Sequence, residues 1–408
     1  MNPILRAPVY AISRVYLVWV AAITVLYGVI NVRILSQFAL GDWLINYAGG
    51  FVRRGLFGEG ILLFAHLSPR PLYLLLAIQI CLYAVVWFFL WTLAKQYPWD
   101  LWSLALWLSP ATLAFTVLDP PGAYRKEILL FALLCGICAM LRSGVSLSKV
   151  SFALTAGIVV MALCHEALLL FMPYLLAPFL ILTPDLKRFL KISILPVLAG
   201  AATLLLVISH PGTPPQRQII CQTVINTVHA KNEAICAGAI DAIGVSQNEE
   251  HQMVVRSMRR SHYLSLYGTY ALLGLLPLSF ALAAHARIAV RRRSVRIVVF
   301  TGVLSVCLTI PLFYGAIDWG RWIYIHLLCL LLLVFFAFAK PRADLGKQMT
   351  VANVLPSGAA GPVAAIALIA YTLLWTLPYY GDFPPRFGYL GLAKYLRGHQ
   401  SARQTPRQ

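Results

Sequence analysis

Long apolar runs, separated by short polar segments, recur along almost the whole chain. A transmembrane helix needs about 20 predominantly apolar residues to cross a hydrocarbon core of about 30 Å. Runs that approach this length predict spanning helices near residues 15–35, 72–94, 101–117, 128–141, 192–209, 263–285, 297–316, 322–339 and 360–378. We therefore expect an all-α, polytopic transmembrane helical bundle in which the whole chain forms a single integral membrane domain.

The apolar stretch from Val150 to Thr183 needs a separate interpretation. It is too long for one ordinary helix, and Cys164, His165 and Glu166 interrupt it. We interpret it as two short helices that meet at a polar tip. With these two, the pattern predicts about 11 crossings.

Basic residues set the predicted orientation, because short cytoplasmic loops carry an excess of Lys and Arg. With a cytoplasmic N-terminus, the basic loops all fall on one side, and the densest of them is Arg287–Arg296. Basic loops also flank Val150–Thr183 at both ends, so this segment must cross twice or not at all. The first exoplasmic loop then covers residues 36–71, and a longer exoplasmic loop covers residues 210–262.

The composition agrees with this class of protein. Of the 408 residues, 60% are hydrophobic and 12% are charged, which excludes a soluble globular protein with a wetted surface. The basic excess, 33 Lys and Arg against 14 Asp and Glu, predicts membrane lipid and no nucleic acid as a partner. Residues 380–408 form a basic C-terminal tail, which an odd number of crossings places on the exoplasmic side. Either the tail is exoplasmic, or the run 360–378 is miscounted as a crossing.

The long exoplasmic loop carries two further predictions. Cys221 and Cys236 fall within it, and an oxidising compartment permits a disulfide between them, with two unpaired thiols as the alternative. Arg256 and Arg260 lie four residues apart just before a crossing. On a helix they form a basic stripe for a pyrophosphate or for lipid headgroups, and headgroup anchoring is the commoner use.

The first exoplasmic loop holds a compact set of polar residues. Asp42 and Asn46 are four residues apart, so on a helix they share a face. Arg53 and Arg54 follow two glycines and supply planar donors suited to phosphate oxygens. We favour a site that holds a diphosphate and deprotonates a nucleophile over an interfacial helix with headgroup-binding arginines, because the arginine pair opposes the orientation bias.

A second cluster follows the sequence Asp119-Pro-Pro-Gly, which predicts a turn that enters a helix. Arg125 and Lys126 begin that helix and can bind phosphate. The alternative is an ordinary capped loop with an ion pair between Asp119 and Arg125.

His165 and Glu166 form a third cluster, where the two short helices are predicted to meet. Ionisable groups at membrane depth usually mark a site or a polar pathway. Histidine titrates near neutrality, which suits proton transfer. A histidine that donates to a backbone carbonyl at the helix break is the alternative.

The fourth cluster is Asp318 and Arg321, which are three residues apart and can pair on one helical turn. Trp319 and Trp322 suit either the interface belt or stacking on a sugar face. The alternative is an aromatic hairpin with a salt bridge. Because the topology places all four clusters on the outer side, we expect them to converge on one anionic substrate.

The order of these parts resembles the polytopic GT-C glycosyltransferases: a short cytoplasmic N-terminus, an acid-bearing first outer loop, many crossings and one longer outer loop. The motifs Arg-Lys-Glu, His-Glu and Asp-Trp-Gly-Arg-Trp are similar to those of bacterial Wzy/EpsG-type polysaccharide polymerases. The layout covers most of the chain, whereas the motifs are short. The resemblance implies a donor linked to polyprenyl diphosphate, such as undecaprenyl diphosphate, and an active face on the periplasmic side of the inner membrane.

The resemblance also implies that Asp42 is the general base on a glycan acceptor and that the arginines stabilise the leaving diphosphate. Asp42 has no adjacent second acid, so we expect transfer without a metal or other cofactor. A polysaccharide assembly complex is a further expected partner. Two other classes compete with this one: a transporter or flippase of an anionic lipid-linked glycan, and a structural subunit of an envelope-synthesis complex.

Overall fold

The computed structural model describes residues 3–65, 70–245, 247–260, 262–339 and 360–379, and within these ranges it contains helices and no β-strand. The all-α prediction is therefore confirmed. Seven described helices are long and apolar enough to cross a membrane: Val9–Ile34 within α1 (Pro3–Ile34), α3 (Pro71–Ala94), α7 (Leu147–Cys164), α9 (Leu186–Ile208), α12 (Tyr263–Ala286), the continuous segment Ala289–Gly315 of η5 (Ala289–Arg291) and α13 (Arg292–Gly315), and α14 (Trp319–Phe338). This supports a multi-pass membrane protein, while the count of about 11 crossings stays a prediction.

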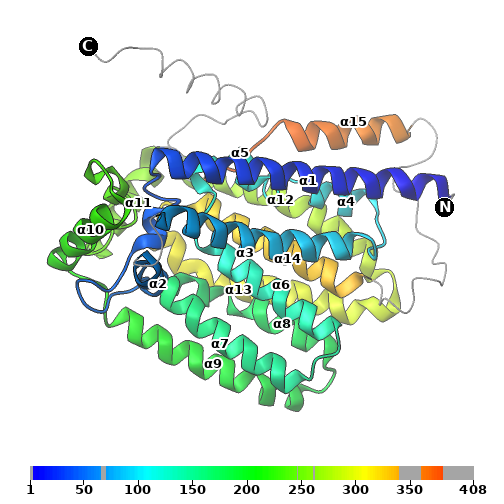
Figure 1. The fold of residues 1–408 in the computed structure, drawn as a ribbon. Helices are drawn as coiled ribbons and strands as arrows, with labels where there is room; N and C mark the ends of the chain where they lie inside the picture. Colours follow the sequence, from blue (N-terminus) through cyan, green and yellow to red (C-terminus); the bar gives the residue numbers. More distant parts are fainter. Residues whose placement is uncertain (1–2, 66–69, 246, 261, 340–359, 380–408) are drawn as a thin grey trace, which may run out of the picture.

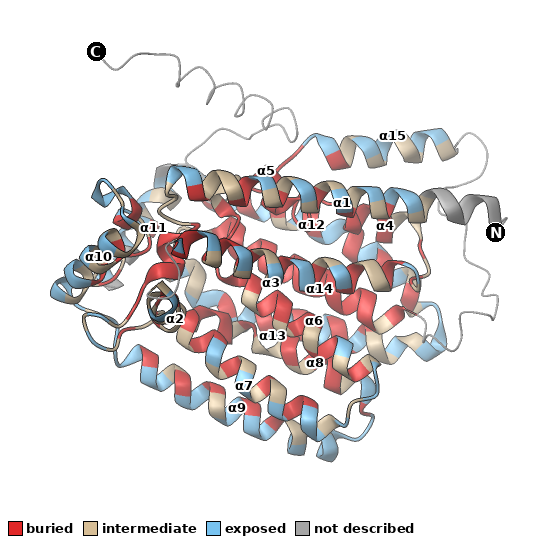
Figure 2. Cartoon of the chain, viewed as in Figure 1, coloured by how far each residue is buried: buried red, intermediate tan, exposed pale blue. Residues whose placement is uncertain are grey.

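Shorter apolar helices complete the bundle, in which the long helices lie side by side (Figure 1). They are α6 (Glu127–Arg142), α8 (Met172–Leu182) and α15 (Ala360–Leu373). Helix α14 is apolar over most of its length and almost completely buried, as expected of a helix at the centre of a bundle. Helix α9 instead buries one stripe and exposes its other faces (Figure 2), which suits the outer layer of a membrane domain.

The continuous helix predicted over residues 101–117 is wrong. The chain forms α4 (Leu101–Trp107), a buried series of turns, and the four-residue α5 (Phe115–Leu118). Pro110 has no N–H donor and disfavours helix at the residue before it. Non-helical backbone is tolerated at membrane depth when protein surrounds it and its polar groups are satisfied. The Thr112 hydroxyl supplies one such bond, donating to the Leu106 carbonyl at 3.0 Å.

The prediction of two helices that meet at a polar tip is confirmed. Helix α7 ends at Cys164, and His165 is extended, with φ −163° and ψ 99°. The 3-10 helix η3 (Glu166–Phe171) then leads into α8.

The two predicted exoplasmic loops pack together at one end of the bundle, which we call the capped end (Figure 1). The first loop contributes η1 (Gly41–Leu44) and α2 (Leu56–Ala65); the second contributes α10 (Pro214–Val228), η4 (Glu233–Cys236) and α11 (Gln247–Arg260). The Arg53 amide joins the loops by donating to the His210 carbonyl at 2.9 Å. Cys221 and Cys236 form a disulfide that ties α10 to η4, with their Cα atoms 5.7 Å apart.

Replacing both Cys221 and Cys236 with Ser should loosen this cap. The bond closes a loop with a sequence separation of 15, and a loop of this size contributes about 3 kcal/mol by restricting the unfolded chain. We expect faster proteolytic cleavage within residues 210–245 under native conditions. Cys81→Ser, which removes an exposed free thiol, is the matched control; equal cleavage of both variants would contradict the prediction.

After α15 the chain returns to the capped end. The Tyr379 amide donates to Asp119 Oδ2 at 2.5 Å, and the Gly320 amide donates to the Tyr379 carbonyl at 3.0 Å. Gly320 is required there, since a Cβ atom at this position would lie 1.8 Å from the Pro378 carbonyl oxygen. The run 360–378 thus ends beside Asp119, while the number of crossings stays a prediction. The tail 380–408 lies outside the described residues.

Candidate functional site

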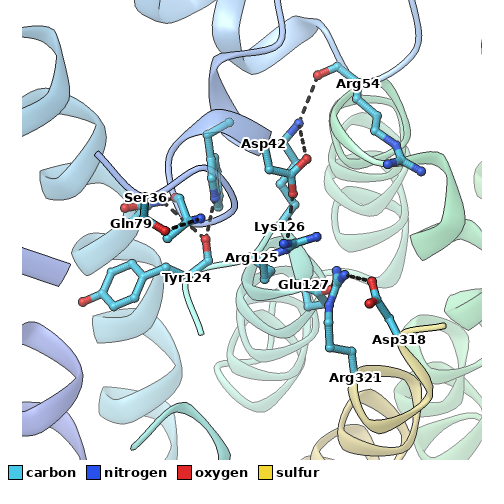
Figure 3. A network of polar contacts seen from close by, with 12 residues as sticks. Ser36, Asp42, Arg54, Gln79, Tyr124, Arg125, Lys126, Glu127, Asp318 and Arg321 are labelled. Atoms are coloured by element: carbon cyan, nitrogen blue, oxygen red, sulfur yellow. Dashed lines mark hydrogen bonds and ion pairs between the residues drawn. The ribbon is translucent and has the colours of Figure 1, made fainter. Parts of the chain in front are cut away.

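Side chains from all four charged clusters converge at the capped end. Figure 3 shows members of three of them, including Asp42, Lys126 and Arg321. Five basic residues form ion pairs with four carboxylates, and we call this set, together with His165, the charged cluster. Its members are Asp42, Arg53, Arg54, Arg125, Lys126, Glu127, His165, Glu166, Asp318 and Arg321. Convergence follows because η1, the start of α6, the α7–η3 junction and the start of α14 all lie at one end of the bundle.

Asp42 lies at the centre of the charged cluster and is 1% exposed. Lys126 Nζ is 3.6 Å from Asp42 Oδ1, and Arg125 Nε is 3.8 Å from Asp42 Oδ2. Burial alone would raise the pKa of Asp42, but the Lys126 and Arg125 charges outweigh it and hold that pKa well below its usual range. Asp42 is therefore ionised, and an anion that engages these two cations would make it a stronger base.

Lys126 is completely buried, and its Nζ donates to the Arg54 carbonyl at 3.1 Å. Burial lowers the pKa of Lys126, and Asp42 partly offsets this effect. Arg54 has φ +70°, a left-handed conformation that costs a residue other than glycine about 1–3 kcal/mol. The conformation turns the Arg54 carbonyl toward Lys126, and such strain is characteristic of functional sites.

Glu166 fixes the side chain of Arg54. Arg54 Nε lies 3.0 Å from each Glu166 carboxylate oxygen, and Arg54 Nη2 lies 2.7 Å from Oε1. Arg53 Nη1 approaches the same carboxylate at 3.6 Å. These arginine side chains remain 20–22% exposed, so they form the accessible rim of the charged cluster.

Arg321 forms the deeper part of the charged cluster and is 2% exposed. Its Nη2 donates to Glu127, and its Nη1 donates to Asp318 Oδ2 at 2.5 Å. Glu127 belongs to the same predicted charged cluster as Arg125 and Lys126, although the sequence assigned it no binding or catalytic role. It lies at the N-terminus of α6, a position where a carboxylate is favoured.

Backbone contacts hold the loops that carry these charges. The carbonyl of Tyr124 accepts from Trp43 Nε1 at 2.7 Å and from Gln79 Nε2 at 3.5 Å. The Tyr124 amide donates to the Tyr83 hydroxyl at 3.1 Å. Trp43, which follows Asp42, is therefore bonded to Tyr124, which precedes Arg125, and α3 holds Tyr124 through two further bonds. The backbone that carries the charges is thus held in place before any ligand binds.

Several buried polar atoms of the charged cluster have no hydrogen-bond partner within the described chain. They are both carboxylate oxygens of Asp42, Arg125 Nε, His165 Nδ1 and Arg321 Nε. More than about 90% of buried backbone polar groups, and most buried side-chain polar atoms, are hydrogen-bonded in folded proteins. Orphaned donors and acceptors from four separate elements at one place therefore point to a ligand-binding site.

Not every predicted site residue joins the charged cluster. The expectation that Asn46 shares a helix face with Asp42 is wrong, because η1 ends at Leu44. The Asn46 amide donates to the Leu44 carbonyl and accepts from the Ala48 amide, each at 3.0 Å, so it stabilises the loop. Arg256 is exposed on α11, where its Nε donates to the Gln252 carbonyl, and the Arg260 side chain lies outside the described residues.

Comparison of the chain with protein-family models, curated proteins and solved structures found no significant match. The resemblance to GT-C enzymes therefore stays a prediction. Within the described ranges, no group of three or more His, Cys, Asp or Glu side chains is arranged to hold a metal ion. The interpretation of the site thus depends on its own geometry and charge.

Proposed function

We propose that this protein is a membrane glycosyltransferase or polysaccharide polymerase that uses a glycan donor linked to polyprenyl diphosphate. The observation that carries the proposal is Asp42, a buried carboxylate without a hydrogen bond, held between Lys126 and Arg125. An acid flanked by cations supplies the two groups that this reaction needs: a base for the acceptor and positive charge for the departing diphosphate.

In the proposed reaction, an acceptor hydroxyl oxygen forms a bond to the anomeric carbon of the donor sugar. The bond from that carbon to the phosphate oxygen breaks, and the diphosphate leaves with the electron pair. The hydroxyl proton passes to Asp42. Engagement of the diphosphate by Lys126 and Arg125 withdraws their charge from Asp42 and raises its pKa, so donor binding itself activates the base.

We assign the charged cluster to the periplasmic face of the bacterial inner membrane. The capped end lies opposite the basic segment Arg287–Arg296 (Figure 1), and basic loops favour the cytoplasm. The disulfide between Cys221 and Cys236 suits an oxidising compartment. Both arguments support the orientation proposed from the sequence.

A transporter or flippase of an anionic lipid-linked glycan is the second candidate. It predicts charged residues that continue through the bundle to the opposite face. The close ion pairs found among the described buried side chains lie at the capped end, which favours an enzyme with a one-sided site. Conversion of a donor by the purified chain without partners would distinguish this enzyme from a structural subunit.

Deleting the protein should change the glycan profile of the cell. For a polymerase we expect loss of long chains and accumulation of a single lipid-linked repeat, both restored by the wild-type protein and not by Arg54→Ala at equal membrane abundance. Arg217→Ala is the matched control, because Arg217 pairs with Asp241 on the exposed cap. An unchanged profile in the deletion strain would contradict the polymerase assignment.

A further inference from the structure

The loop between Asp42 and Arg53 carries a tyrosine whose hydroxyl has no partner. The Tyr47 hydroxyl oxygen is buried and forms no hydrogen bond with any described residue, like the unpartnered atoms of the charged cluster. Burying a hydroxyl without a partner is unfavourable, and a phenylalanine ring would fill the same space without that penalty. Burial raises the pKa of Tyr47 to about 12, so the hydroxyl keeps its proton at neutral pH. The Tyr47 hydroxyl is therefore a donor available to a ligand.

Three contacts fix the position of Tyr47. Its amide donates to Glu59 Oε2 at 3.0 Å, and its carbonyl accepts from the Gly50 amide at 2.8 Å. Its ring lies against Gly55, where a Cβ atom would come within 2.2 Å of Tyr47 Cε1. The tyrosine is thus held by its backbone and by its ring, and a side chain at position 55 would displace it.

The Tyr47 side chain borders the charged cluster. Its ring packs against the residue after Arg54, and the Arg54 carbonyl accepts from Lys126 Nζ at 3.1 Å. Cys164, which ends α7 and is completely buried, interacts electrostatically with both Tyr47 and Asp42. The Tyr47 hydroxyl and the Asp42 carboxylate are both buried, so a ligand group that reaches Asp42 must enter the same buried region.

Aromatic rings continue from Tyr47 toward the exposed rim. The Phe51 ring lies 5.1 Å from the Tyr47 ring, with 31° between their planes, and the exposed His210 ring meets Phe51 edge-on at 5.1 Å. Gly50, with φ +101°, turns the chain so that Phe51 returns to Tyr47. The loop segment 43–52 contains no charged residue. Tyr47, Phe51 and His210, which we call the aromatic wall, therefore form an uncharged surface beside the basic rim.

We infer that the aromatic wall binds the acceptor sugar and that the Tyr47 hydroxyl donates a hydrogen bond to it next to Asp42. The inference rests on the proposed function and adds a substrate-binding residue to it. A sugar ring has an apolar face of C–H groups that packs on aromatic rings, and its hydroxyl groups pair with a few well-placed polar atoms. A diphosphate would instead require cations, which the segment 43–52 lacks.

The test measures binding of the methyl glycosides of glucose, galactose and mannose to the purified full chain in lipid nanodiscs, by saturation-transfer difference NMR. Tyr47→Phe removes only the hydroxyl, so it should weaken binding about three- to tenfold, the range of one neutral hydrogen bond. Phe51→Leu removes a ring and should weaken binding about threefold or more.

Tyr10→Phe is the matched control. The Tyr10 hydroxyl is also buried without a partner among the described residues, but Tyr10 lies near the start of α1, outside the charged cluster. Tyr10→Phe should bind the glycosides like the wild type. Neither tyrosine substitution removes a described hydrogen bond of the hydroxyl, so both proteins should unfold at the wild-type temperature or above it.

Wild-type affinity in Tyr47→Phe would overturn the inference, and so would the absence of glycoside binding by the wild-type chain. Failure of the proposed function gives a different pattern. In that case Tyr47→Phe would still weaken glycoside binding, while Asp42→Asn would leave the cellular glycan unchanged. Unchanged glycoside binding in Tyr47→Phe, together with an inactive Asp42→Asn, would retain the function and exclude the aromatic wall from it.

Discussion

Asp42→Asn should lower glycan transfer at least about 100-fold, because general base catalysis typically contributes a factor of about 10²–10⁴. The amide has nearly the same shape as the carboxylate but cannot take the acceptor proton. Its charge is also lost, so Lys126 and Arg125 are left without the carboxylate that lies within 4 Å of both. Transfer is measured with purified protein, as product formed from lipid-linked repeat units.

Loss of activity through misfolding must be separated from loss of the base. Removing one partner of a buried ion pair costs about 3–5 kcal/mol, so the single variant should also unfold more easily. Adding Lys126→Met to Asp42→Asn removes one unpaired cation and should recover part of that stability. We expect the double variant to remain inactive, and Asp241→Asn, a change to an exposed carboxylate, to remain active. An active double variant would eliminate Asp42 as the base.

Convergence of the charged clusters could be predicted from the sequence because it depends on the alternation of crossings. Basic loops fix which ends of helices share a side, and helix ends on one side of a small bundle lie close together. Asp42, Arg125, Glu166 and Arg321 come from widely separated parts of the chain, yet each follows or precedes an apolar run. Their individual partners could not be predicted, because pairing depends on side-chain geometry within a few ångströms.

Some features of the structure differ from the prediction or were not predicted. The physical cause can be found in the sequence for some of them and not for others. Pro110 is a clear signal against a continuous helix over 101–117, although the apolar run there is long enough for one crossing. Asn46 was misplaced because helical spacing was applied to a segment that ends after four residues. The contact between Tyr379 and Asp119 joins residues 260 positions apart, and no local pattern encodes it.

A related limit applies to the interior of the bundle. An apolar groove beside α14 is lined by residues that include Gly268 of α12 and Gly302 of α13. Glycine in a membrane helix is equally consistent with close packing, so composition does not distinguish a groove from a tight contact. Only the positions of the surrounding side chains separate the two: Gly302 lies against Leu330, whereas Gly268 faces open space.

Glu127→Gln should destabilise the protein by about 3–5 kcal/mol, because the carboxylate is buried and pairs with the buried guanidinium of Arg321. The change leaves Asp318 as the remaining carboxylate bonded to Arg321, and Asp318 is partly exposed. We expect a lower midpoint of thermal unfolding in lipid nanodiscs. Asp241→Asn breaks the exposed pair with Arg217 and should cost well under about 1 kcal/mol, because solvent screens it.

The Glu127→Gln variant also distinguishes a residue that positions a cation from a residue that takes part in proton transfer. Glu127 bonds to Arg321, so its removal acts on the position of a cation. Once the protein is stabilised by excess lipid, donor affinity should fall while the maximal rate is largely retained, whereas Asp42→Asn lowers the maximal rate. Loss of rate without loss of affinity in Glu127→Gln would place Glu127 in the proton-transfer step. Unchanged unfolding would mean that water reaches the pair and that the α6 end of the charged cluster is open.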